Sequence, residues 1–255
     1  MRPIFLFTDY GVTGPYVGQV KAALLAQGFA GPVIDLMADA PAFDPKASAY
    51  LLAALLPRMP ADAVGLCVVD PGVGGDRAAL VVKADGRLLV GPDNGLFELA
   101  ARRAATLGIW RIEWQPDELS ATFHGRDLFA PVAADLAQGR RPQTPWCSPT
   151  QRIDRGDWPN DWAVTIYVDG FGNVMTGLRG EAVAGDDVLV VNGHRLTAAR
   201  TFSDLPPGQP FWYVNSVGLV ELAVNGGRAD QCLGIAGRAV VERQKNQDAS
   251  DAASA

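Results

Sequence analysis

The stretch DPKASAYLLAALLPRMPADAVGLCVVD, residues 44–70, predicts a helix followed by a strand. Asp44 is a good helix N-cap, and Pro45 suits the first helical position because its missing N–H has no partner there in any case. Alanine and leucine then recur at helical spacing. The apolar run at residues 63–69 is typical of a strand, and it ends on Asp70. We therefore expect a strand whose carboxyl end carries a polar side chain.

The same alternation runs through the rest of the first half. The expected strands are residues 3–7, 32–37 and 108–114, the expected helices are 16–28, 94–105 and 131–139, and a hairpin is expected at 79–91. The hairpin prediction depends on Asp85-Gly86, a pair that favours a tight turn. Strands that alternate with helices indicate an α/β N-terminal domain, residues 1–145, with a largely parallel sheet flanked by helices.

The sequence pattern changes after residue 140, and the remaining chain predicts a second domain. Residues 146–162 contain many Pro, Trp and polar residues without periodicity, which is typical of a linker. Short apolar runs separated by turns such as Asn192-Gly193 then predict a smaller, mostly antiparallel β domain at residues 163–243. The small and polar residues 244–255 predict a disordered tail.

The composition narrows the class of protein. Of 255 residues, 48% are hydrophobic and 20% are charged, so the chain can bury a sizeable core. The net charge is −6 and no basic stripe is present, so we expect no nucleic-acid partner. The three cysteines and two histidines lack metal-ligand spacing, which argues against a zinc site. The N-terminal apolar run is too short for a signal peptide or membrane span, so we expect a cytoplasmic protein without a membrane partner.

Polar residues follow predicted strands at three places, and ligands collect at the carboxyl ends of parallel strands. The first place is Asp9 in FLFTDYGVTG, residues 5–14. A strand that ends in this way resembles the start of a haloacid-dehalogenase phosphatase, but Gly11 stands where that chemistry needs a second aspartate. Asp9 can instead accept hydrogen bonds from a sugar diol, or it can cap the turn that follows.

The second place is VVDPGVGGDR, residues 68–77. Asp70 and Arg77 are close enough in sequence to meet across the glycine turn, either as a structural ion pair or as part of a site. The glycine spacing matches neither a dinucleotide-binding fingerprint nor a P-loop. The sequence therefore predicts a contact between the two side chains and leaves its purpose open.

The third place is TFHGRDLFAP, residues 122–131, which we interpret as a loop that enters a helix at Pro131. His124 is either a general base or a structural residue of that loop. Arg126 and Asp127 are interpreted as bracing the helix entry, with no catalytic role.

A glycine-containing bend, DGFGNVMTG at residues 169–177, joins two β-runs of the second domain. A hairpin explains its glycines but does not require Phe171 or Asn173. An aromatic ring can stack on a purine while a neighbouring amide reads its polar edge. The bend is therefore a candidate purine site.

Six segments, taken in order, resemble one family. TDYG with YVG, DPGVGGDR, GPDNGL, TFHGRDLFAP, DGFGN, and NSVG with its following E.A.N.G are similar to the S-adenosylmethionine hydroxide adenosyltransferases, relatives of the fluorinase and chlorinase enzymes, over residues 3–242. The resemblance implies an α/β N-terminal domain and a smaller β-barrel-like C-terminal domain. It also implies a homotrimer with sites at the subunit interfaces. The implied reaction is hydrolysis of S-adenosylmethionine to adenosine and L-methionine, with no metal and no other cofactor.

The resemblance also implies roles for individual residues. The catalytic set of the family falls on Asp70, Arg77 and His124, and its ribose-binding aspartate falls on Asp9. The remaining substrate-binding positions fall on Asp169, Phe171, Asn173 and Ser216. Which of Asp70 and His124 accepts a proton from the attacking water stays open.

Three departures from the family pattern affect this reading. Gly14-Pro15 stands where many members have an acidic residue, Thr176-Gly177 replaces a threonine-asparagine pair, and Val217 stands where the halogenases have an arginine. The last two put the contacts to the methionine end in doubt. They keep open an alternative, a non-catalytic protein that binds S-adenosylmethionine or adenosine.

A third reading is a halide-using synthase of 5′-halo-adenosine. Fluorinase-like enzymes replace the Asp and His with tyrosines, and a carboxylate in the pocket would repel a bare halide. Gly125 also lacks the serine hydroxyl that resembles the halide donor of the fluorinase. Asp70 and His124 therefore favour water or hydroxide as the nucleophile.

Overall fold

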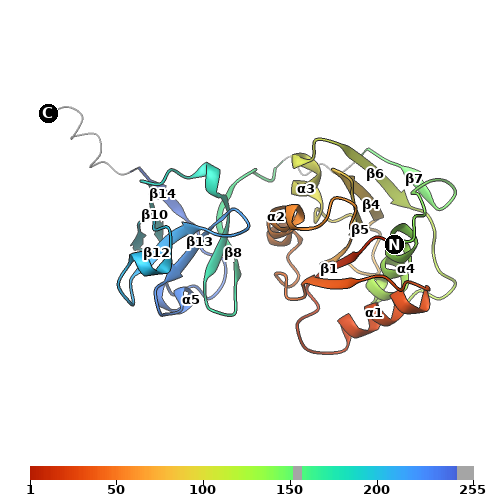
Figure 1. The fold of residues 1–255 in the computed structure, drawn as a ribbon, viewed down its shortest axis with the longest axis horizontal. Helices are drawn as coiled ribbons and strands as arrows, with labels where there is room; N and C mark the ends of the chain where they lie inside the picture. Colours follow the sequence, from red (N-terminus) through yellow and green to blue (C-terminus); the bar gives the residue numbers. More distant parts are fainter. Residues whose placement is uncertain (152–156, 246–255) are drawn as a thin grey trace. The chain divides into compact units, whose positions relative to one another are not determined.

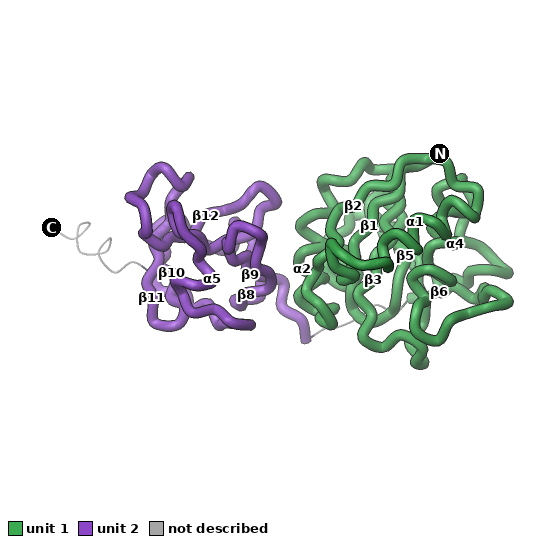
Figure 2. The backbone as a smooth tube through the Cα atoms, turned by 90° about the horizontal axis from the view of Figure 1, so that it is seen from below, with its two compact units in different colours: residues 1–156 green, residues 157–255 purple. Residues whose placement is uncertain are grey.

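The chain forms two compact units, residues 1–156 and 157–255 (Figure 2). The structure is a computed structural model that describes residues 1–151 and 157–245. Residues 152–156 of the predicted linker and residues 246–255 of the predicted tail lie outside the described residues.

The first unit is built on a mixed sheet covered by helices (Figure 1). Within residues 1–151 the sheet has seven strands in the order β2-β1-β3-β5-β4-β6-β7. The strands are β1 (Ile4–Thr8), β2 (Val33–Met37), β3 (Val64–Val68), β4 (Ala79–Ala84), β5 (Arg87–Pro92), β6 (Leu107–Ile112) and β7 (Cys147–Pro149). The predicted α/β class is confirmed. Strands β2, β1, β3 and β5 run parallel, while β4, β6 and β7 add antiparallel pairings because the Asp85-Gly86 hairpin reverses the chain.

Helices pack on both faces of this sheet. They are α1 (Tyr16–Ala26), α2 (Pro45–Leu55), α3 (Glu98–Arg103) and α4 (Ala130–Ala137). The α2 start is as predicted: the Asp44 side chain accepts a hydrogen bond from the Ala47 N–H at 3.0 Å, and Pro45 opens the helix. Helices α1 and α4 share one core with the inner residues of β1 and β3, while α2 and α3 pack together on the opposite face (Figure 1).

The segment predicted as a loop before α4 is helical, which corrects that prediction. Residues Gly125–Phe129 form a π-helical turn that continues directly into α4. The proline signal at Pro131 marks the α-helix start, but a wider turn before it has no separate sequence signature. His124 therefore stands at the N-cap of a continuous helical segment.

Part of the predicted linker belongs to the first sheet. Residues Cys147–Pro149 form β7 and pair antiparallel with β6. Prolines at 145 and 149 make this stretch read as a loop, yet an edge strand tolerates proline because one side of it needs no partner. Trp162, the last residue of the predicted linker, is the first residue of β8.

The second unit is made of antiparallel sheets, as predicted. Within residues 157–245 these are a four-stranded sheet, β12-β13-β9-β8, and a three-stranded sheet, β11-β10-β14. The elements are β8 (Trp162–Val168), β9 (Val174–Arg179), β10 (Val188–Val191), β11 (His194–Leu196), β12 (Pro210–Val214), β13 (Leu219–Val224), α5 (Ala229–Cys232) and β14 (Glu242–Gln244). Gln244, where the predicted tail begins, is the last residue of β14. Val174, Trp212, Val220 and Leu222 belong to the core of this unit.

Candidate active site

Two aspartates leave the first sheet side by side. Strands β1 and β3 are parallel neighbours, and Thr8 at the end of β1 is paired with Val68 of β3. Asp9 and Asp70 follow these two strand ends directly or nearly so, as expected for a site at the carboxyl edge of the sheet. Asn94 fixes the end of β3, because its side-chain amide donates to the Val69 carbonyl at 2.8 Å. Turn formation alone explains the GPDNGL segment in the sequence, so this second role of Asn94 is visible only in the structure.

Asp70 and Arg77 meet across the glycine turn. The Arg77 Nε lies 3.0 Å from Asp70 Oδ1 and 2.9 Å from Oδ2, and Nη2 also donates to Oδ2. Only 5% of the Asp70 side chain and 12% of the Arg77 side chain is exposed. The turn itself needs Gly74: its φ is +80°, and a Cβ there would lie 2.4 Å from the carbonyl oxygen of Ala121. This close approach packs the turn against the segment that leads to His124.

Arg77 connects the pair to the third predicted catalytic residue. Its Nη2 lies 2.9 Å from the Nδ1 of His124, which is buried. A guanidinium can only donate, so Nδ1 accepts and the neutral imidazole carries its proton on Nε2. Burial lowers the pKa of His124 below its usual value, and the positive charge of Arg77 lowers it further against the opposing charge of Asp70. The structure therefore brings the three residues together around one guanidinium, with His124 neutral.

Asp9 lies beside this cluster. Its Oδ2 accepts a hydrogen bond from the Phe43 N–H at 3.1 Å, and Phe43 has a left-handed φ of 58° with an exposed ring. Burial raises the pKa of Asp9; the Phe43 N–H opposes the rise and the negative charge of Asp70 adds to it. The two strand-end carboxylates are therefore close enough for the charge of Asp70 to act on Asp9.

Tyr10 is a member of the site that the sequence missed. A Cβ built on Gly125 would lie 1.9 Å from the Tyr10 hydroxyl, so that hydroxyl occupies the space above Gly125. Burial raises the pKa of Tyr10, and the charges of Asp9 and Asp70 raise it further, which keeps the phenol neutral. Its ring packs edge-on against Phe123 with the centroids 5.6 Å apart. Tyr10 belongs to the TDYG segment that carries the family resemblance, but no role was assigned to it from the sequence.

Arg126 and Asp127 brace the helix entry, in keeping with the structural role assigned to them. The Arg126 Nε donates to Asp127 Oδ1 at 2.6 Å, and Asp127 Oδ2 accepts the Ser120 N–H at 3.0 Å. Arg126 also reaches α1, where its Nη1 donates to the Gln19 Oε1 at 2.9 Å. These bonds tie the residues around His124 to two neighbouring elements.

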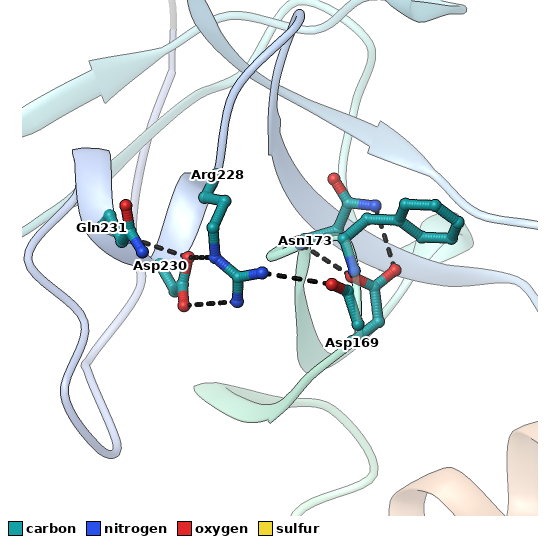
Figure 3. Close-up of polar contacts among 7 residues, drawn as sticks. Asp169, Asn173, Arg228, Asp230 and Gln231 are labelled. Atoms are coloured by element: carbon teal, nitrogen blue, oxygen red, sulfur yellow. Dashed lines mark hydrogen bonds and ion pairs between the residues drawn. The ribbon is translucent and has the colours of Figure 1, made fainter.

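In the second unit, the 169–173 turn between β8 and β9 is organised by Asp169 (Figure 3). Asp169 Oδ1 accepts the N–H groups of Phe171 and Asn173, both at 2.9 Å, and Oδ2 accepts the Asn173 side-chain amide at 3.0 Å. The Phe171 side chain is left 82% exposed. Arg228 supports the turn from outside: its Nη1 donates to the Gly170 carbonyl at 3.1 Å, and its Nε donates to Asp230 at 3.1 Å.

The 215–218 turn between β12 and β13 carries Ser216, which is exposed. Asn215 shapes this turn: its Oδ1 accepts the N–H groups of Val217 at 3.1 Å and Leu219 at 3.0 Å. Its Nδ2 donates to Glu221 Oε2 at 2.7 Å. Glu221 is the glutamate of the E.A.N.G segment that carries the family resemblance, but no role was assigned to it from the sequence.

One of the departures from the family pattern is structural. Thr176 is buried within β9, where its hydroxyl donates to the Val220 carbonyl at 2.8 Å. A Cβ on Gly177 would lie 2.7 Å from the Trp162 carbonyl oxygen, so β8 and β9 approach closely here. Thr176-Gly177 therefore serves sheet packing, and Val217 remains the departure that bears on an exposed turn.

Two further features bear on function. Among residues 1–151 and 157–245, no three His, Cys, Asp or Glu side chains are grouped so that they could hold a metal ion. Within the same ranges, each helix is too short or too polar to cross a membrane.

Comparison with known proteins identifies similarities over nearly the whole chain. A family model described as SAM hydroxide adenosyltransferase N-terminal domain matches residues 4–145, and its C-terminal counterpart matches residues 163–242. A Thermus thermophilus protein named (R)-S-adenosyl-L-methionine hydrolase is 42% identical over 253 residues, covering 92% of this chain and 96% of the relative. A Salinispora arenicola protein of the same name is 38% identical, covering 89% and 92%.

Solved structures agree with these sequence matches. An uncharacterized conserved protein from Thermotoga maritima superimposes with a TM-score of 0.82 at 29% identity, covering 93% of this chain and 99% of that one. A conserved hypothetical protein from Thermus thermophilus superimposes with a TM-score of 0.75 at 36% identity, covering 95% and 100%. The two-unit fold is thus shared with experimentally determined structures.

Proposed function

The chain belongs to the SAM hydroxide adenosyltransferase family, and we propose that it hydrolyses S-adenosyl-L-methionine to adenosine and L-methionine. Relatives that match most of the chain carry the name (R)-S-adenosyl-L-methionine hydrolase. The observation that carries the proposal is the contact of one guanidinium, Arg77, with both Asp70 and His124 at the carboxyl edge of the first sheet.

The chemistry of the substrate explains why such a cluster suffices. A sulfonium leaves as a neutral thioether, so its departure needs no general acid. A water oxygen forms a bond to C5′ while the C5′–S bond breaks and its electron pair stays on sulfur. What the protein must supply is a water held in line with C5′ and an acceptor for the proton that this water loses. No metal and no other cofactor is required for these steps.

The hydrogen-bond directions suggest how the proton is handled. His124 accepts from Arg77 through Nδ1, so its Nε2 is a donor that can hold the water. Asp70 retains lone pairs beyond those used by Arg77 and is the acceptor for the proton in this arrangement. Arg77 fixes both groups and stabilises the hydroxide-like charge on the attacking oxygen. A bare halide would meet the Asp70 carboxylate, which disfavours halogenation.

We further infer that residues of the second unit bind the adenosine part of the substrate and that the protein acts as a homotrimer. Phe171 is an exposed ring beside a fixed amide, Asn173, and this pair suits a purine. The trimer, with each site between the first unit of one subunit and the second unit of its neighbour, is supported by family resemblance. Light scattering coupled to size-exclusion chromatography tests the mass: a monomer at assay concentration would contradict it.

The reaction is tested by incubating the protein with S-adenosyl-L-methionine in water enriched in oxygen-18. We expect equal amounts of adenosine and methionine, with the label in the adenosine 5′-hydroxyl. Release of adenosine and methionine no greater than in a protein-free control would refute hydrolysis, and tight binding without turnover would identify a binding protein instead. Halide-dependent 5′-halo-adenosine would point to the halogenase reaction.

A further inference from the structure

We propose that Glu221 is a positioning residue that holds the 215–218 turn and supplies the negative charge by which the second unit selects the cationic end of S-adenosylmethionine. The inference deepens the proposed function and rests on it for the identity of the ligand. It concerns a side chain that the catalytic cluster does not use.

Glu221 lies on the face of the four-stranded sheet that also carries candidate substrate residues. In this sheet Glu221 is paired with Tyr213 of β12 on one side and Met175 of β9 on the other. Cross-strand partners share a face, and so do residues two apart along a strand. Asn215 follows Tyr213 by two and Asn173 precedes Met175 by two, so both turns extend from the face of Glu221. Their neighbours Trp212, Val174 and Leu222 belong to the core on the opposite face.

Glu221 differs from two other buried acidic residues, Glu98 and Asp187, in the groups that its carboxylate contacts. Glu98 forms an ion pair with Arg102 at 2.5 Å, and Asp187 forms one with Arg243 at 2.5 Å. Glu221 is 2% exposed, yet within residues 1–151 and 157–245 it has no ion pair. Its oxygens accept from the Tyr213 hydroxyl and from the Asn215 amide, which are both neutral donors. A buried carboxylate without a cation lowers stability, so its presence here indicates a use for the charge.

Glu221 also fixes the backbone of the neighbouring turn. Its Oε2 orients the Asn215 amide, because the reverse orientation would place the amide oxygen against a carboxylate. The Asn215 Oδ1 is thereby aimed at the N–H groups of Val217 and Leu219, which shape the turn that presents Ser216. The same carboxylate thus sets the geometry of the turn and the sign of the potential beside it.

The charge has a chemical counterpart in the proposed substrate. S-adenosylmethionine carries a sulfonium, an ammonium and a carboxylate group and is therefore a net cation, while adenosine, the proposed product, is neutral. With Val217 in place of an arginine, the 215–218 turn adds no cation to this face. The negative charge of Glu221 therefore favours the cationic substrate over the neutral product, which assists both binding and release.

The test compares ligands that differ in charge, measured by calorimetry so that turnover is not needed. The probes are sinefungin, which has an amine-bearing carbon in place of the sulfonium, S-adenosylhomocysteine, which lacks that charge, and adenosine. We expect the unsubstituted protein to bind sinefungin at least about tenfold more tightly than S-adenosylhomocysteine. Glu221→Gln should abolish most of this preference and change adenosine binding by less than about twofold. The matched control is Glu181→Gln, an exposed carboxylate of the same unit, which should keep the preference.

Three results would overturn the inference. Equal affinity of the unsubstituted protein for sinefungin and S-adenosylhomocysteine would do so whether or not Glu221→Gln folds. A parallel loss of all three ligands in a folded Glu221→Gln protein would reduce Glu221 to a structural residue. An equal loss of preference in Tyr213→Phe, which keeps the carboxylate, would show that charge is not the determinant. Because binding is measured without turnover, a protein that prefers the cation but releases no product would refute hydrolysis and leave this inference standing.

Discussion

The two units hold the carboxylates of their candidate sites in opposite ways. In the first unit, Asp70 is neutralised by Arg77, whose guanidinium also holds His124. In the second unit, Glu221 accepts hydrogen bonds from a phenol and a side-chain amide, and Asp169 accepts them from backbone N–H groups and a side-chain amide, with Arg228 near enough to act on it electrostatically. A paired carboxylate is held in a fixed geometry, which suits a site that must orient one water. Carboxylates held by neutral donors keep their field, which suits recognition of a cation.

The comparison is tested most severely by removing the one cation of the catalytic cluster. Arg77→Met leaves the Asp70 carboxylate buried and unpaired, so we expect a loss of about 3–5 kcal/mol in the free energy of unfolding and loss of measurable turnover. The measurements are urea denaturation and the product assay. As a control, Arg179→Met removes a more exposed arginine of the second unit, and we expect it to cost about 1 kcal/mol or less. A similar loss in the free energy of unfolding for both variants would contradict the proposed difference between the two units.

His124→Ala should separate chemistry from stability within the same cluster. The imidazole accepts one hydrogen bond from Arg77 and carries no net charge, so its removal leaves the Asp70–Arg77 pair intact. Because His124 positions the water rather than taking its proton, we expect kcat to fall by about 10²-fold while KM changes little. The thermal midpoint is measured in parallel. A variant with full turnover would remove His124 from the mechanism, and a variant that unfolds would make it structural.

The pH dependence of the unsubstituted protein follows from the direction of the His124 shift. Burial and Arg77 lower the pKa of His124 below its usual 6.5, so the neutral, accepting form persists to lower pH in the folded protein. We expect kcat/KM to be level above pH 6.5 and to fall only as the pH drops through the lowered pKa. The unfolded chain binds the proton first, so this contribution to stability is present above 6.5 and is lost over the same acidic interval. An acid limb centred above 6.5 in the rate profile would contradict the assignment.

The sequence predicted the helices and strands of the first unit better than it predicted the side-chain contacts of the candidate active site. Asp44-Pro45 and the apolar run before Asp70 are local signals, and the helix and strand they predict are present. Strand β7 and the π-helical turn after His124 were missed, because a proline-flanked edge strand and a wide helical turn look like loops. The Arg77–His124 contact joins residues 47 positions apart, and only a resemblance could suggest it.

The missed site residues share a physical reason. Tyr10 matters because of what lies across from it, the space above Gly125, and Glu221 matters because its partners are neutral donors. Neither the residue type nor its spacing in the sequence indicates these contacts. Both depend on which strands become neighbours, and sequence periodicity does not determine strand order.

A close approach in the first unit provides the next test. Gly125→Ala places a methyl group against the Tyr10 hydroxyl, so we expect a loss of about 1–3 kcal/mol in the free energy of unfolding. Tyr10→Phe removes the hydroxyl and should recover a large part of that loss in the double variant, with a coupling of about 0.5–3 kcal/mol. Denaturation of the four proteins of the cycle measures it. Additive effects would place the Tyr10 hydroxyl away from Gly125. As a control, Gly139→Ala in an open turn should show no coupling to Tyr10→Phe.

We expect the smallest effect on catalysis from replacing Arg228, an arginine of the second unit whose contacts resemble those of Arg77. Like Arg77, Arg228 donates hydrogen bonds to two groups: the carboxylate of Asp230 and the backbone carbonyl of Gly170 in the 169–173 turn (Figure 3). It differs because the 169–173 turn is already closed by three hydrogen bonds to Asp169, and because 39% of the Arg228 side chain is exposed, against 12% for Arg77, so its ion pair contributes less. We therefore expect Arg228→Ala to raise KM by at most about fivefold with kcat unchanged. Steady-state kinetics beside Arg77→Met measures the contrast. A large fall in kcat would mean that the second unit, too, depends on a paired arginine, and the division of labour between paired and unpaired carboxylates would no longer hold.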